Sequence, residues 1–165
     1  MSIRFPKTVV GISHNDQGAS VLGGWAYPVT LPQDTDNVLV KMNASVVAGG
    51  LSAIFQTTDD GVNWYDCART SIVSNSGATA AIGQNAQWLS IPTINSGVRT
   101  AATFAGASIV SAGIGAAAAS TLAQGQVSGL PILSQQNRVF LISTGNATAV
   151  AASVTVMVNQ QSATA

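Results

Sequence analysis

The most regular pattern in the chain is an alternation of apolar and other residues close to its C-terminal end. Every second residue there is Val or Ala, at Val150, Ala152, Val154, Val156 and Val158. Because successive side chains of a strand point to opposite faces, this spacing predicts a strand with one buried face. The preceding run over residues 139–142, Val-Phe-Leu-Ile, is apolar at every position. Such a run predicts a strand that is buried on both faces.

A similar alternation occupies residues 38–67. Apolar residues recur at every second position over 38–42 and again over 51–55, with Gly49 and Gly50 between the two segments. Asp59-Asp60-Gly61 then separates the second segment from a third one over 62–67. Alternating segments between Gly and Asp turns predict an antiparallel meander.

These segments together predict an all-β fold, either an antiparallel β-sandwich or a jelly roll of about seven to nine strands. We assign this domain to residues 37–165, in which residues 100–111 favour a further strand and the Gly/Ala-rich residues 112–130 fit either a helix or a loop. Residues 1–36 contain Pro and Gly at short intervals and predict an irregular N-terminal arm. Aromatic residues in such an arm anchor it to a surface, so we expect an interface at Phe5, Trp25 and Tyr27.

The chain carries very little charge. Only 7% of its 165 residues are charged, against roughly 25% in ordinary soluble domains. All six acidic residues lie within the first 66 positions, and none of them is Glu. A surface so poor in charge indicates coverage by neighbouring molecules; the alternative is a compact protein hydrated through hydroxyl and amide groups. The net charge is zero and the cations are dispersed, which disfavours nucleic acid as a partner.

The residues that carry enzyme chemistry are scarce. The chain has one histidine, His14, and one cysteine, Cys67, which we interpret as a buried thiol. Residues 113–118 match a G-x-G-x-x-A dinucleotide pattern, but no acidic residue follows Asp66 to bind a ribose. We therefore expect no enzyme activity, catalytic residue, cofactor or metal site. Residues 100–137 are uncharged but lack the Leu, Ile and Val density of a membrane helix, and residues 1–10 lack the apolar segment of a signal peptide.

The clearest local motif lies at Thr57-Thr58-Asp59-Asp60-Gly61-Val62-Asn63-Trp64, which fits Ser/Thr-x-Asp-x-Gly-x-x-Trp. In this motif the Asp59 carboxylate accepts backbone N–H groups, Gly61 takes a positive φ and Trp64 covers the base of a β-hairpin. A calcium site at Asp59, Asp60 and Asp66 is a weaker interpretation, because too few oxygen ligands are close in sequence.

The segment over residues 53–66 resembles a hairpin that is common in structural proteins of tailed bacteriophages. The resemblance implies a non-enzymatic virion protein, foremost a decoration or cement protein on the head surface. Its partners would be the major capsid protein and copies of itself, as a homotrimer, with the N-terminal arm reaching onto them through Trp25 and Tyr27. One alternative is a tail tube, adaptor or fibre-associated protein. A second alternative is a carbohydrate-binding module that stacks sugars on Trp25, Trp64, Tyr65 or Trp88.

Overall fold

The computed structural model describes residues 7–16, 24–32, 35–47, 49–75, 81–90, 136–144 and 149–160. Its strands are β1 (Lys7–Asp16), β2 (Gly24–Thr30), β3 (Thr35–Val47), β4 (Gly49–Thr57), β5 (Tyr65–Arg69), β6 (Val73–Asn75), β7 (Ala81–Ser90), β8 (Gln136–Thr144) and β9 (Ala149–Gln160). These residues include no helix, so the predicted all-β class is confirmed for them. Accordingly, no helix in this part of the chain is long and apolar enough to span a membrane.

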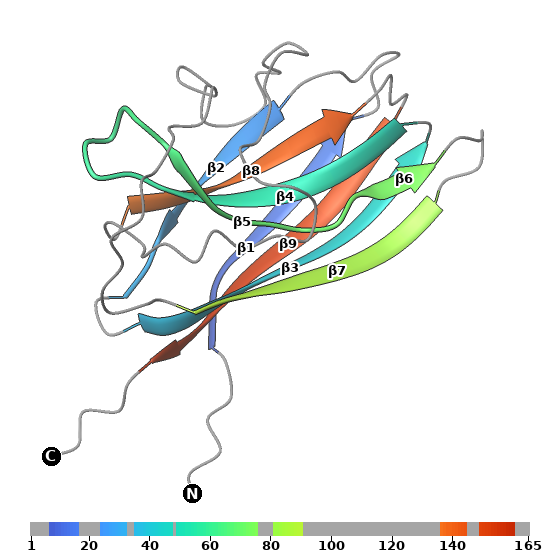
Figure 1. The fold of residues 1–165 in the computed structure, drawn as a ribbon. Coiled ribbons are helices and arrows are strands. Elements are labelled where there is room, and N and C mark those ends of the chain that lie inside the picture. The colour runs from blue at the N-terminus through green and yellow to red at the C-terminus, as the bar shows by residue number, and fades with distance from the viewer. Residues whose placement is uncertain are drawn as a thin grey trace, which may run out of the picture.

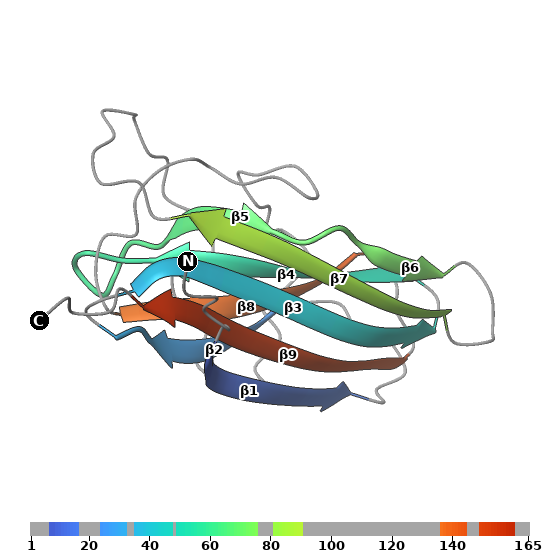
Figure 2. The same ribbon diagram turned by 90° about the horizontal axis from the view of Figure 1, so that it is seen from below.

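The strands pair in a nested order. β1 pairs with β9, β2 with β8, β3 with β7 and β4 with β5, and every pair is antiparallel. Successive pairs belong to alternate sheets. The first sheet has the order β1-β9-β3-β7, and the second has the order β2-β8-β4-β5, with the short β6 beside β4. Figure 1 shows the two sheets stacked on each other, and Figure 2 shows the strands of the first sheet side by side. Nested pairs shared between two stacked sheets make the sandwich a jelly roll.

The core lies between the two sheets. The Val and Ala side chains at every second position of β9 are buried there, as their spacing predicts. The apolar side chains at every second position of β3, over residues 38–46, are buried there too. The second sheet contributes Leu51, Phe55 and Leu141 to the same cluster, and Trp25 enters it from β2. Burial of apolar area is the main favourable term in folding, so these strands stabilise the sandwich.

The second sheet is buried on its other face as well. Residues 139–142 are all buried, which confirms that this run is covered on both sides. Phe140 and Ile142 point away from the core cluster, and Phe140 shares this face with its neighbours in register, Ala26 and Ile54. The first sheet differs, because the outward side chains of β1 are mostly exposed.

The irregular arm predicted for residues 1–36 is wrong where the structure describes it. Residues 7–16 form β1 and residues 24–30 form β2, and their partners β9 and β8 come from the end of the chain. The proposed domain boundary after residue 36 therefore fails too. Pro28 does not prevent strand formation, because β2 is an edge strand, where a residue without an N–H group is tolerated.

The predicted meander over residues 38–67 is only half right. β4 and β5 form the expected hairpin, but β3 and β4 belong to different sheets and do not pair. The chain passes between the sheets beside Gly49, which has a φ of 83°. Alternation reveals which face of a strand is buried but does not identify its partner strand. The strand expected over 100–111 and the segment 112–130 lie outside the described residues.

Candidate interaction surface

The structure describes two of the three residues expected at an interface, and these two differ in burial. Trp25 is only 2% exposed and belongs to the core of its own sandwich, so its prediction as a contact residue is wrong. Tyr27 is half-buried, packs against the same core and shares a hydrogen bond with His14. Phe5 lies outside the described residues. Trp25 is likewise excluded as a stacking platform for a sugar.

The hairpin turn between β4 and β5 is held by Asp60. Its carboxylate accepts the backbone N–H groups of Val62 and Asn63 at 2.8 and 2.7 Å, and the Asn63 side-chain amide at 2.6 Å. These hydrogen bonds stabilise the charged form, lowering the pKa of Asp60 to about 2. Gly61 has the expected positive φ, 73°, and its N–H donates to the Thr58 hydroxyl.

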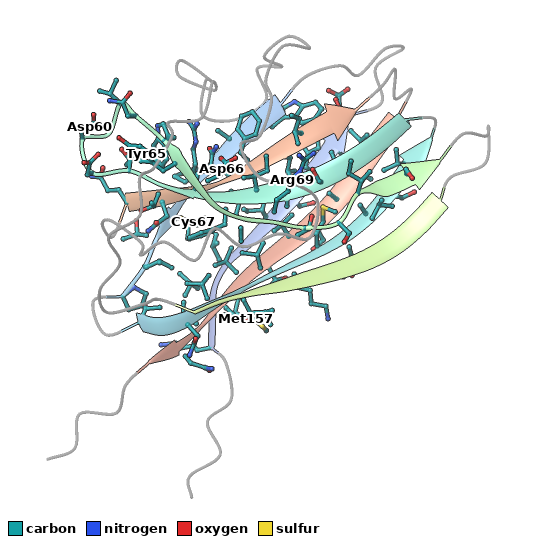
Figure 3. The ribbon with its side chains drawn as sticks, viewed as in Figure 1. Asp60, Tyr65, Asp66, Cys67, Arg69 and Met157 are labelled. Atoms are coloured by element: carbon teal, nitrogen blue, oxygen red, sulfur yellow. The ribbon has the colours of Figure 1, made fainter. Side chains whose placement is uncertain are left out.

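The role that the sequence assigned to Asp59 is therefore wrong. The closing carboxylate comes one residue later, and the hydroxyl of the motif belongs to Thr58 rather than Thr57. Two adjacent Asp residues and two adjacent Thr residues allow both registers, and the backbone geometry of the turn selects the later one. Figure 3 shows Asp60 at the tip of this hairpin.

Behind the turn, a buried polar row crosses the second sheet. Arg138, Gln56 and Asp66 are neighbours in register on three adjacent strands. The Gln56 side chain accepts a hydrogen bond from Arg138 Nε and donates one to Asp66 Oδ1, both at 2.6 Å. The Arg138 guanidinium also lies over the Trp64 ring, 4.2 Å from its centre. Burial lowers the pKa of Arg138 to about 10, although nearby Asp66 opposes the shift.

The pattern of the sequence did not reveal this row. Gln56 was interpreted only as one polar position of an alternating strand, and Arg138 precedes an apolar run that gives no sign of its partners. A signal was nevertheless present, because Arg138 is a lone cation next to four residues of a buried strand. A cation in that position needs a polar partner. The Arg138 contact also occupies one face of Trp64, which weakens the case for this residue as a sugar platform.

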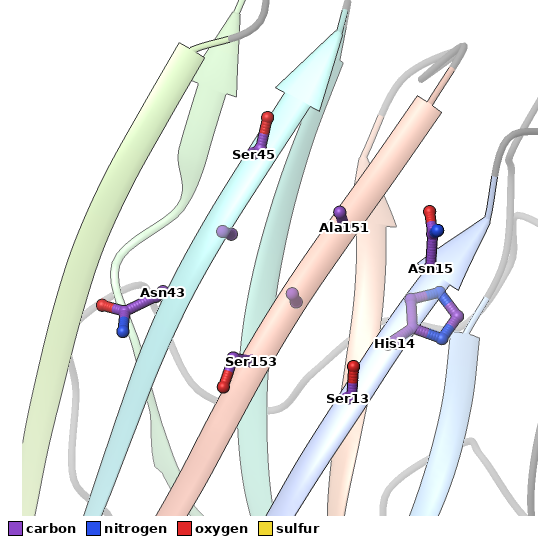
Figure 4. Close-up of a pocket in the computed structure, with 9 residues that line it drawn as sticks. Ser13, His14, Asn15, Asn43, Ser45, Ala151 and Ser153 are labelled. Atoms are coloured by element: carbon purple, nitrogen blue, oxygen red, sulfur yellow. The ribbon is translucent and has the colours of Figure 1, made fainter.

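A polar face without charge lies on the outside of the first sheet. We call it the neutral face, and its side chains are small or carry only amide and hydroxyl groups: Gly11, Ser13, Asn15, Asn43, Ser45, Ala151, Ser153 and Thr155. Strand register brings them together, because Ser13 lies opposite Ser153, which lies opposite Asn43. Small side chains leave a shallow depression of about 420 Å³ over β1, β9 and β3 (Figure 4).

The neutral face is suited to contact rather than to chemistry. None of its side chains titrates near neutral pH, and Lys41 is the cation at its border, opposite Thr155. Amides and hydroxyls both donate and accept hydrogen bonds, and they lose less hydration energy on burial than charged groups do. In the described ranges, no three His, Cys, Asp or Glu side chains gather to hold a metal ion.

The sole histidine and the sole cysteine do not form a reactive pair. Nδ1 of His14 lies 2.6 Å from the Tyr27 hydroxyl, whereas the Cys67 thiol donates to the Tyr65 carbonyl at 3.7 Å. Cys67 is fully buried, which confirms its interpretation as a buried thiol.

Comparison with protein-family models, with curated proteins and with solved structures gives no match for this chain. Its class therefore rests on its own strands, which define an antiparallel β-sandwich of two sheets.

Proposed function

We propose that the chain is a non-enzymatic structural protein of a tailed-phage virion, a decoration or cement protein that binds the head through its neutral face. One observation carries the proposal, namely an outward sheet face on which eight neutral residues, exposed or partly exposed, lie in register, with Lys41 at its border. The jelly roll is a fold of viral capsid domains, which agrees with the hairpin resemblance at residues 53–66. Lectin domains share this fold, so the argument depends on the face and not on the fold alone.

The mechanism is adhesion by many identical weak contacts. A shallow face of Ser, Asn, Thr and Ala approaches a neighbouring protein surface closely without placing unpaired charges in the contact. Copies bound around a symmetry axis of the head, as a homotrimer, reinforce one another because each contact raises the effective concentration of the next. In this proposal the neutral face, and not Trp25, makes the contact with the head.

Removing residues 2–30 is not a useful test, because the deletion takes away β1 and β2 and exposes the core. The informative change is Ser153→Lys, which places a charge at an exposed position in the middle of the neutral face. Val62→Lys is the matched control, because Val62 is 65% exposed at the far hairpin tip. Both variants should keep the circular dichroism spectrum of the natural protein.

Binding is measured by co-sedimentation with DNA-free heads and, separately, with purified tails. We expect the natural chain and Val62→Lys to sediment with heads, and Ser153→Lys to bind at least about tenfold more weakly, the effect of roughly 1.4 kcal/mol. Sedimentation with tails alone would replace the head assignment by the tail alternative. Equal head binding by all three proteins would refute the neutral face as the contact surface.

A further inference from the structure

His14 connects the edges of the two sheets. It lies on β1, the edge strand of the first sheet, and its partners Trp25 and Tyr27 lie on β2, the edge strand of the second. The imidazole and indole ring centres are 4.2 Å apart and the ring planes are tilted by 44°. His14 is only 6% exposed, so water does not replace these contacts. Figure 4 shows its position on β1 at the border of the neutral face.

The surroundings of this ring accommodate a neutral imidazole better than a charged one. Nδ1 has the Tyr27 hydroxyl as its partner, but Nε2 is buried and has no hydrogen-bond partner in the structure. A neutral ring has one donor and one acceptor nitrogen, and one of them can stay unpaired at modest cost. An imidazolium has two N–H donors, so its second donor would be buried without an acceptor.

Burial and the nearby Asp16 shift the pKa of His14 in opposite directions, and the effect of burial is the larger one. Asp16, on the same strand, favours the charged ring, while burial disfavours it more strongly, so the pKa of His14 lies below its ordinary value of 6.5. From β2, Tyr27 faces the ring with a pKa that burial raises, so it stays neutral in acid. From β9, the register partner is Ala152, which does not titrate.

We propose that His14 is an acid-sensitive latch between the sheets, and that its protonation releases the ring from Trp25 and Tyr27 and loosens β1 while the remaining sandwich stays folded. The direction follows from proton linkage. When β1 opens, His14 regains its ordinary proton affinity, so between about pH 6.5 and the lowered pKa of the closed form the open form binds more protons than the closed form. Acid therefore favours opening, and an edge strand opens more easily than a central one. The inference does not depend on the proposed function.

Two measurements on the natural protein test the latch. Because the chain has a single histidine, NMR of the imidazole gives one unambiguous titration curve. We expect a midpoint below that of the same chain unfolded in urea. Hydrogen exchange, corrected for intrinsic rates, should show residues 7–16 losing protection by about tenfold or more from pH 7.5 to pH 5, with β3 much less affected.

His14→Gln is the decisive variant, because its side chain can still bond the Tyr27 hydroxyl but does not titrate. Its β1 should lose no more protection in acid than its β3. An unshifted or raised His14 midpoint, or the same acid loosening in His14→Gln, would overturn the proposal. If this variant does not fold, the titration and exchange of the natural protein decide the question by themselves.

Discussion

Gly24 and Phe140 are packed so closely that no side chain fits between them. They lie on the same face of the second sheet, on the adjacent strands β2 and β8. A Cβ atom on Gly24 would overlap the Phe140 ring and lie 3.2 Å from the carbonyl oxygen of Leu141. Phe140 is fully buried, so a shift of its ring would have to displace closely packed neighbours. Gly24 therefore determines how closely the edge strand approaches its neighbour.

Replacing Gly24 by Ala tests this relationship. We expect Gly24→Ala to lower the free energy of unfolding by about 1–3 kcal/mol, the usual cost of overpacking. Gly11→Ala is the matched control on the other edge strand, because a Cβ there meets nothing within 4 Å. Urea unfolding should show the control equal to or slightly more stable than the natural protein. Equal losses in both variants would contradict the steric explanation.

The two neighbouring acids of the hairpin should behave differently. Asp60→Ala removes the carboxylate that accepts the N–H groups of Val62 and Asn63, so we expect a lower melting temperature. Asp59→Ala should have little effect. Comparison of the two variants therefore shows whether Asp59 or Asp60 closes the turn. Equal melting temperatures would show that the turn does not need the Asp60 carboxylate.

The same carboxylate gives stability a pH dependence. The pKa of Asp60 is lowered to about 2 in the folded protein, from 3.8 without the turn. Its stabilising contribution is therefore complete above pH 3.8 and is lost as the pH falls through about 2. Carboxyl NMR shifts of Asp60 should report a midpoint near 2, and Asp60→Asn should remove this part of the acid dependence.

The buried row of the second sheet should be sensitive to the loss of its central amide. Gln56→Met keeps the length of the side chain but removes its hydrogen bonds to Arg138 and Asp66. Because both partners are charged groups that would be left buried, we expect a loss of about 3 kcal/mol or more. Thermal unfolding measures it, and combination with Asp66→Asn in a double-mutant cycle should give less than the sum of the two losses.

The Cys67 thiol should be unreactive in the folded protein. It is fully buried on β5, so we expect a thiol reagent to label it only as fast as the sandwich opens. Labelling in urea should be fast and complete, and it provides the control. Rapid labelling of the folded protein would show that this strand opens far more often than the rest of the core.

Much of the fold was predictable from local patterns. The spacing of Val in residues 150–158 and the apolar run at 139–142 specified burial on one face and on both faces, and the structure confirms both. The hairpin with Gly61 was also predictable, because a tight turn needs a residue that tolerates positive φ. These inferences succeed because strand periodicity and turn chemistry are properties of neighbouring residues.

Other features depend on which strands meet, and only the tertiary structure decided them. The pairing of β1 with β9 and of β2 with β8 joins the two ends of the chain, so Trp25 became a core residue instead of a contact residue. Register alone placed Gln56 between Arg138 and Asp66, and it also gathered the neutral face from three strands. The alternation of each strand is the same for any choice of partner, so the sequence by itself determined the strands and their buried faces but not their neighbours.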